Sequence, residues 1–223
     1  MKTVLVVGAH ADDEVLGCGG TMARLASEGK DVHVLLLADG ETSRAGAGAA
    51  ETASRNSAAE NAAAILGCRS IVIKDLPDNR LDAVALLDIV RVIEERIAEL
   101  RPDTVFAHHA GDVNIDHRRV HEAVLAACRP QPGHPVRTLM FYEVASSTEW
   151  RPPNSGAPFL PNVFYDISTT AELKRRALEA YATEMRAFPH PRSFEAVEAL
   201  ARWRGATVGV AAAEAFMLGR SIN

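Results

Sequence analysis

The sequence predicts an α/β fold: a single domain built on a doubly wound, mostly parallel sheet with helices on both faces. Three observations support this prediction. Apolar, β-branched runs alternate with helical segments over residues 1–145, which is typical of a parallel sheet built from βαβ units. The length of 223 residues suits one domain with a sizeable core. Hydrophobic residues make up 48% of the chain and charged residues 24%, as in ordinary globular proteins.

The first strand is predicted at residues 3–7, where the continuous apolar run from Val4 to Val7 is typical of a buried parallel strand. Similar runs predict later strands at residues 31–38, 70–74, 104–107, 138–144 and 162–167. A proline-rich stretch between residues 150 and 161 predicts a long loop that lines or covers a site.

Helical segments are expected between these strands and after the last one. Residues 84–100 give the strongest pattern, with one apolar stripe that comprises Leu86, Ile89, Val90, Ile93 and Ile97. Gly67 is a C-cap signal that ends an alanine-rich helix at residues 52–67. The other helices are predicted at residues 17–29, 117–128, 171–185, 194–204 and 208–218.

Charge and cysteine content exclude several classes of protein. The formal net charge is −5 and the chain has no long basic run, which argues against nucleic acid or an anionic membrane as a partner. No apolar stretch approaches the roughly 18 residues that would span a membrane. Cys18, Cys68 and Cys128 are scattered, so we expect buried thiols in a cytoplasmic protein, not disulfides or a cysteine-based zinc site.

Two clusters of histidine and acidic residues follow the first and fourth predicted strands. The first cluster comprises His10, Asp12, Asp13 and Glu14. The second comprises His108, His109, Asp112, Asn114, Asp116 and His117. If the strand order is the common 3-2-1-4, these two strands are neighbours at the topological switch point, where such folds bind ligands. We therefore expect both clusters to face one crevice.

The residue types in these clusters point to a metal site. A catalytic zinc site uses three nitrogen or oxygen ligands and leaves a fourth position for water. His10, Asp13 and His117 supply such a set, which leaves Asp12 to act as a base and Asp116 to orient an imidazole. The alternative is that the acids cap a helix and the histidines make ordinary loop hydrogen bonds.

The glycines at positions 17, 19 and 20 invite a dinucleotide-binding interpretation. The run lacks the G-x-G-x-x-G pattern, however, and it follows an acidic cluster that would repel a pyrophosphate. We favour the interpretation that these glycines let a helix pack tightly on the sheet.

Residues 9–20 (AHADDEVLGCGG) resemble the signature of the PIG-L/LmbE family of zinc-dependent N-deacetylases, and residues 114–118 (NIDHR) resemble its second motif. Weaker similarity at residues 76–79, 188–193, 203–205 and 213–216 extends the resemblance over nearly the whole chain. The resemblance implies a Rossmann-like fold, one deacetylase domain over residues 1–223, and removal of the acetyl group from an N-acetylated amino sugar.

Carried onto this chain, the resemblance implies that His10, Asp13 and His117 hold zinc, or another divalent metal, and that Asp12 is the general base. Two positions depart from the family pattern. Ala11 replaces the usual proline, which changes the stiffness of the loop and not its ligand chemistry. Asn114 replaces a histidine that is proposed to stabilise the oxyanion in many members, and an amide donates a hydrogen bond but cannot act as an acid.

His190 is our candidate for the missing oxyanion donor. In similar proteins its segment can approach an active site, sometimes that of a neighbouring subunit, so a homo-oligomer is one expectation. Arg55, Arg192, His109 and Asp112 are candidate substrate-binding residues. For Arg55 the alternative is a solvated helix charge, and for His190 and Arg192 it is a stiff, exposed turn. Further side chains that could rim the crevice or stack on a sugar are Asp39, Glu41, Arg44, Trp150 and Phe159.

We therefore expect a zinc hydrolase that deacetylates a small N-acetylglucosamine-type sugar, free or conjugated, by metal-activated water and an aspartate base. One alternative is an amidase that acts on a larger sugar or thiol conjugate. Another is a zinc- and sugar-binding protein in which Asn114 marks lost catalysis. A nucleotide-binding or oxidoreductase module would instead bind a dinucleotide without metal.

Overall fold

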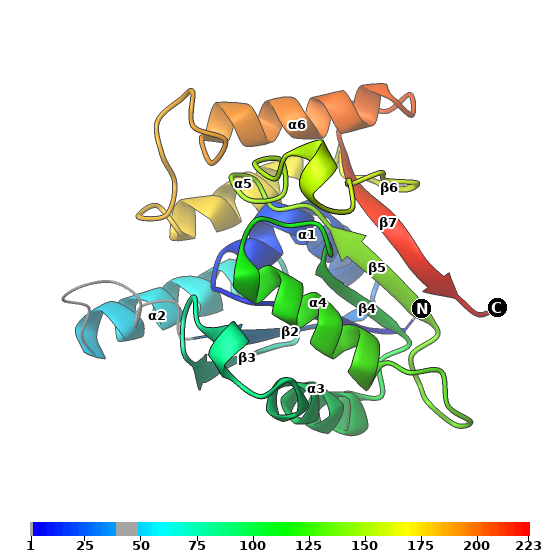
Figure 1. The fold of residues 1–223 in the computed structure, drawn as a ribbon. Helices are drawn as coiled ribbons and strands as arrows, with labels where there is room; N and C mark the ends of the chain where they lie inside the picture. Colours follow the sequence, from blue (N-terminus) through cyan, green and yellow to red (C-terminus); the bar gives the residue numbers. More distant parts are fainter. Residues whose placement is uncertain (1, 39–48) are drawn as a thin grey trace.

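The expected mostly parallel sheet is present in a computed structural model, which describes residues 2–38 and 49–223 (Figure 1). The strand order is β3-β2-β1-β4-β5-β7-β6. Strands β1 to β5 pair in parallel, and β7 is antiparallel to both of its neighbours. The 3-2-1-4 order is therefore confirmed. The strands are β1 (Thr3–Gly8), β2 (Asp31–Ala38), β3 (Ser70–Leu76), β4 (Thr104–His108), β5 (Thr138–Tyr142), β6 (Val163–Asp166) and β7 (Ala213–Ser221).

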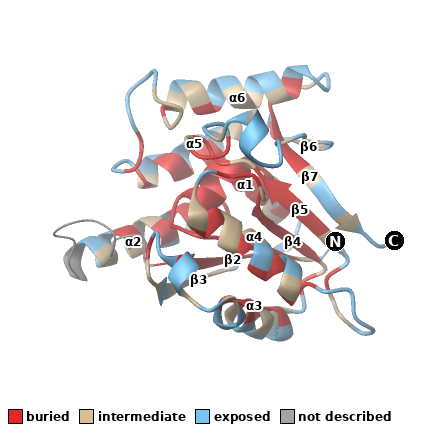
Figure 2. Cartoon of the chain, viewed as in Figure 1, coloured by how far each residue is buried: buried red, intermediate tan, exposed pale blue. Residues whose placement is uncertain are grey.

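Helices cover both faces of the sheet, which is buried along its centre (Figure 2). Val4 and Val6 of β1 belong to the core that α1, α2 and α5 cover. Leu5 and Val7 point to the opposite core, under α3 and α4, because side chains alternate along a strand. The helices are α1 (Asp13–Ser27), α2 (Ala49–Ile65), α3 (Leu86–Leu100), α4 (Ile115–Ala127), α5 (Ala171–Ala180) and α6 (Phe194–Ala206), with short 3-10 turns η1 (Leu81–Ala83) and η2 (Pro153–Ser155).

None of the helices in the described part of the chain is both long and apolar enough to cross a membrane.

The helix predicted at residues 208–218 is wrong, because most of that segment forms β7. Alanine-rich sequence favours a helix intrinsically, but here the backbone finds hydrogen-bonding partners on both sides, in β5 and β6. Phe216 is fully buried and packs edge-to-face on Phe106 of β4, with 5.0 Å between ring centroids. Tertiary pairing therefore outweighs local propensity. Other differences are shifts of element ends, and α1 begins at Asp13 instead of residue 17.

Strands β1 and β4 lie side by side at the switch point, with Val6 paired to Phe106. Their carboxyl ends, Gly8 and His108, therefore open onto the same edge of the sheet. The glycines of α1 serve packing, as predicted, because a Cβ atom at Gly17 would overlap the ring of Tyr142. This close approach holds the start of α1 against the carboxyl end of β5.

Candidate metal centre and active site

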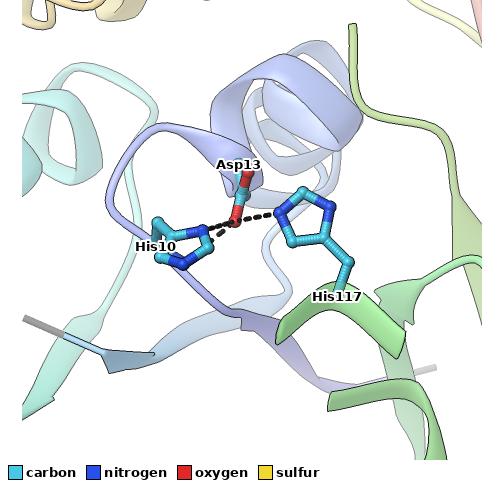
Figure 3. A group of neighbouring side chains, drawn as sticks. All are labelled: His10, Asp13 and His117. Carbon is cyan, nitrogen blue, oxygen red and sulfur yellow. Dashed lines mark hydrogen bonds and ion pairs between the residues drawn. The ribbon is translucent and has the colours of Figure 1, made fainter. Parts of the chain in front are cut away.

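The loop that leaves β1, the first residue of α1 and the first turn of α4 bring His10, Asp13 and His117 together (Figure 3). Asp13 Oδ2 lies 3.3 Å from His10 Nδ1 and 3.3 Å from His117 Nε2. One ligand atom from each residue lies within 4.8 Å of the others, and all three residues are buried. The convergence expected across the switch point is thus present, over a sequence separation of about a hundred residues.

Two buried atoms of this trio are left without a hydrogen-bond partner in the described part of the chain. Among the described residues, Asp13 Oδ1 and His117 Nε2 are buried and lack hydrogen-bond partners, although buried polar atoms in folded proteins are almost always satisfied. Two imidazole nitrogens and a carboxylate oxygen form a donor set that a divalent cation such as zinc accepts. The residues therefore fit a metal ion bound by three protein ligands.

Each of the two imidazoles is held by a carboxylate on its other ring nitrogen. His117 Nδ1 lies 3.1 Å from Asp112 Oδ2, and that oxygen also accepts a hydrogen bond from the Thr148 hydroxyl. His10 Nε2 lies 3.0 Å from Asp116 Oδ2. Asp116 is itself fixed by the backbone N–H groups of residues 79 and 81. Carboxylates in this position set the orientation and basicity of histidine ligands.

The cluster strongly favours positive charge at its centre. Burial would raise the pKa of Asp13, but the imidazoles of His117, His108 and His10 hold it well below its usual range. Burial would lower the pKa of His117, but the carboxylates of Asp13 and Asp112 outweigh that effect and raise it to about 9. Protons or a divalent cation can supply the positive charge that these carboxylates demand.

Asp12 lies beside the trio and does not cap the helix. It occupies the N-cap position of α1 with φ of 118°, and its side chain makes no capping hydrogen bond, so the capping alternative is wrong for this residue. Its carboxylate is almost fully buried and pairs with Arg192, 2.7 Å away. Burial raises the pKa of Asp12 to about 6, and the Arg192 guanidinium opposes that rise. A carboxylate with such a pKa is suited to exchange protons near neutral pH.

Asn114 and His109 are engaged within the protein. Asn114 caps α4, since its side-chain oxygen accepts a hydrogen bond from the Asp116 N–H. Among the residues that the structure describes, its amide nitrogen makes one long contact, 3.4 Å from Asn79 Oδ1. The His109 Nε2 atom lies 2.9 Å from the carbonyl oxygen of Ala157 and ties the long loop after β5 to the loop after β4. Phe159, in the loop after β5, packs edge-on against the His109 ring.

Arg55 lies in α2, and His190 lies in the segment before α6. Arg55 is buried, donates to the carbonyl oxygen of Ala11 and pairs with Glu184, so it is not a solvated helix charge. The His190 ring lies edge-to-face with Trp150, a residue that is 53% exposed. Three other residues named from the sequence, Asp39, Glu41 and Arg44, lie outside the described residues.

Several buried residues around the site had no role assigned from the sequence. His108 is fully buried, stacks on His117 with 3.9 Å between ring centroids, and accepts the Ala9 N–H. Burial and the neighbouring His117 lower the pKa of His108 to about 4, so its imidazole is uncharged at neutral pH and supports the His117 ring by stacking. Asp78 Oδ1 lies 3.1 Å from His10 Nε2. The sequence signal for Asp78 is its place within residues 76–79, one of the segments with weaker similarity to the family.

Fold and geometry together define a class: an α/β protein with a candidate His-Asp-His metal centre at the switch point of its sheet. The family profile described as "GlcNAc-PI de-N-acetylase" (PIG-L) matches residues 5–128. The chain belongs to the PIG-L family, because this match covers more than half of it. The resemblance stated from the sequence is therefore confirmed.

Relatives and solved structures agree with this placement. A 1D-myo-inositol 2-acetamido-2-deoxy-alpha-D-glucopyranoside deacetylase from Rhodococcus erythropolis is 31% identical, with 86% of this chain and 84% of the relative covered. The conserved protein TT1542 from Thermus thermophilus has a TM-score of 0.79 at 30% identity, with 100% of this chain and 97% of that chain covered.

A third match shows that proteins with this fold can differ in the reaction they catalyse. The 4-carboxy-2-hydroxymuconate hydratase GalB from a Pseudomonas strain has a TM-score of 0.81 at 23% identity, with 100% and 98% of the two chains covered. Because that protein is a hydratase by its description, the shared fold does not fix the reaction, which depends on the residues of the site.

Proposed function

We propose that this protein is a metal-dependent N-deacetylase that acts on an N-acetylglucosamine-type sugar, free or conjugated. Family membership and the deacetylase relative support the reaction class. The observation that carries the proposal is a His-Asp-His ligand set in which two buried atoms, Asp13 Oδ1 and His117 Nε2, lack hydrogen-bond partners among the described residues, with a separate buried carboxylate, Asp12, directly beside it. Hydrolysis of an amide needs both an electrophilic centre and a proton acceptor.

In this proposal His10, Asp13 and His117 hold the metal, with zinc as the best fit to the donors. When bound, zinc would supply Lewis acidity that makes water a better nucleophile and polarises the acetyl carbonyl. Asp12 accepts a proton from the attacking water as the water oxygen bonds to the carbonyl carbon. It then returns that proton to the nitrogen as the C–N bond breaks, which yields acetate and the free amine.

The surrounding carboxylates have supporting roles. We assign Asp112 and Asp116 to the orientation of His117 and His10, since each contacts the ring nitrogen that faces away from Asp13. For Asp112 this replaces the substrate-binding role expected from the sequence, because its side chain is buried and its oxygens accept protein hydrogen bonds. Arg55 and His109 stay candidates for substrate contact, and His190 and the Asn114 amide stay candidate oxyanion donors.

The remaining expectations concern the setting of the enzyme. We propose a cytoplasmic protein, on the basis of its three unpaired cysteines. A homo-oligomer in which His190 lies near a neighbouring site is a further proposal, which sedimentation of the purified protein would test.

Release of primary amine from a panel of N-acetylated sugars, before and after chelation and zinc return, tests the proposal. We expect amine release that chelation abolishes and zinc restores. Release only from large conjugates would favour the amidase alternative. Stoichiometric zinc and sugar binding with no release from any substrate would favour the binding protein. Dinucleotide binding without metal would overturn the proposal.

A further inference from the structure

The geometry points to Arg192 as the positioning residue of the catalytic base: its guanidinium holds the Asp12 carboxylate in place for proton transfer. This inference rests on the proposed function and departs from the substrate-binding role expected for Arg192. Nη1 of Arg192 donates to Asp12 Oδ2 at 2.7 Å, although 180 residues separate the two in the sequence. Short bonds between two charged groups are the stronger class of hydrogen bond in proteins.

A second anchor fixes the guanidinium itself. Nε of Arg192 donates to the Ser146 hydroxyl at 2.7 Å. Ser146 follows β5 and has φ of 66°, and Asp12 has φ of 118°. A positive φ is uncommon for residues other than glycine and persists where the surrounding structure enforces it. Asp12 and Ser146, which both accept hydrogen bonds from the Arg192 side chain, are therefore both held in unusual backbone conformations. Such conformations cluster at functional sites.

Hydrogen bonds at both ends hold the loop that carries Arg192 in a fixed conformation. Its ends are joined by the Arg186 N–H, which donates to the carbonyl oxygen of Arg192. The Arg192 N–H donates to His190 Nδ1, and the next residue, Ser193, caps α6. The backbone of Arg192 is thus fixed by the closed loop before it and by the start of α6 after it. Its side chain therefore extends to Asp12 from a rigid segment of backbone.

This arrangement leaves one oxygen of the base available. Arg192 occupies Oδ2 of Asp12, while Oδ1 accepts no hydrogen bond from any residue that the structure describes. The cation also offsets the cost of holding two buried carboxylates, Asp12 and Asp13, next to each other. A fixed carboxylate with one open oxygen is the geometry that a general base needs.

The accessibility of Arg192 argues against substrate binding as its main role. Its side chain is only 21% exposed, and two of its three nitrogens donate within the protein. Loss of a substrate contact would chiefly raise KM, whereas loss of a contact that orients the base lowers kcat. The two roles therefore give different kinetic results.

The experiment compares Arg192→Ala and Arg192→Lys with the zinc-loaded wild type on the best substrate of the sugar panel. We expect Arg192→Ala to lose about 100-fold in kcat, as for misplacement of a reacting group, with KM nearly unchanged and one zinc retained. Guanidinium ion at millimolar concentration should restore part of kcat, whereas sodium at equal ionic strength should not. Arg192→Lys should fall between, because an ammonium ion contacts Oδ2 but cannot also reach Ser146.

Arg186→Ala is the matched control, since Arg186 lies exposed at the other end of the same loop, and its activity should match the wild type. Ser146→Ala removes only the second anchor and should lower kcat by a smaller factor if Arg192→Ala does not fold. A raised KM with unchanged kcat, or no guanidinium rescue of a folded Arg192→Ala, would overturn the inference. An inactive zinc-loaded wild type would instead overturn the proposed function.

Discussion

Asp112 Oδ2 lies 3.1 Å from Nδ1 of His117, on the side of the imidazole that faces away from Asp13. His117 therefore lies between two carboxylates: Asp13 contacts the nitrogen that would bind a metal, and Asp112 contacts the other. Burial would raise the pKa of Asp112, but its bonds with His117 and Ser147 lower it to about 2, so Asp112 stays charged. A charged partner fixes both the tautomer and the direction of the ring.

Asp112→Asn should weaken zinc binding because His117 loses its charged partner. We expect an affinity about 10- to 100-fold lower, measured by competition with a chromophoric chelator. Glu122→Gln, on the exposed face of α4, the helix that carries His117, is the control and should leave the affinity unchanged. Equal zinc affinity in Asp112→Asn and the wild type would show that Asp112 does not orient His117.

Asp12→Asn should keep zinc and lose most turnover, because only the proton acceptor is removed. General acid–base catalysis contributes about 10²- to 10⁴-fold, and kcat should fall by a factor in that range. Metal content by elemental analysis and initial rates of amine release provide the two readouts. Asp75→Asn, an exposed change, is the control. Loss of zinc from Asp12→Asn would mean that the roles of Asp12 and Asp13 are wrongly assigned.

Zinc binding should release protons at pH 7. Without metal, Asp13 and Asp112 outweigh burial and raise the pKa of His117 to about 9, and Asp116 and Asp13 raise that of His10 well above its usual value against the effect of burial. A histidine ligand must be neutral, so both protons leave as the metal binds.

The apparent zinc affinity should therefore fall as the pH is lowered, by about tenfold per pH unit for each proton displaced. The contribution of His117 should disappear above about pH 9. Calorimetry in two buffers of different ionisation enthalpy counts the protons. Zinc binding at pH 7 without proton release would contradict the charge distribution described for the site.

Gly17→Ala should destabilise the fold although it lies in a helix. A Cβ atom there would overlap the ring of Tyr142, whose hydroxyl donates to the carbonyl oxygen of Val7 in β1. Overpacking of this kind costs about 1–3 kcal/mol, which exceeds the gain of up to about 1 kcal/mol from helix propensity. Urea-induced unfolding measures the net loss, and an unchanged midpoint would mean that Tyr142 moves aside freely.

The sequence was sufficient to predict the parallel half of the fold and the convergence of the site. Continuous apolar runs such as Val4–Val7 mark strands buried on both faces, and the 3-2-1-4 order then places His10 beside His117. Strand β7 was missed because its alanines favour a helix locally and only pairing with β5 and β6 makes it a strand.

The partners of the site residues were harder to predict. The contact between Arg192 and Asp12 depends on the path of a loop far along the chain, and no periodic pattern encodes such a path. Asp78 and Thr148 likewise reach the histidine–carboxylate cluster from separate loops. Local sequence therefore indicates which residues carry chemistry, whereas their hydrogen-bond partners follow from tertiary packing.

The most direct test of the account titrates zinc into metal-free wild type and His117→Ala while amine release from the best sugar substrate is followed. Wild-type activity should rise in proportion to zinc up to one equivalent per chain, whereas His117→Ala should bind zinc weakly and stay inactive. Full activity in metal-free His117→Ala would contradict the proposed metal centre and the mechanism built on it.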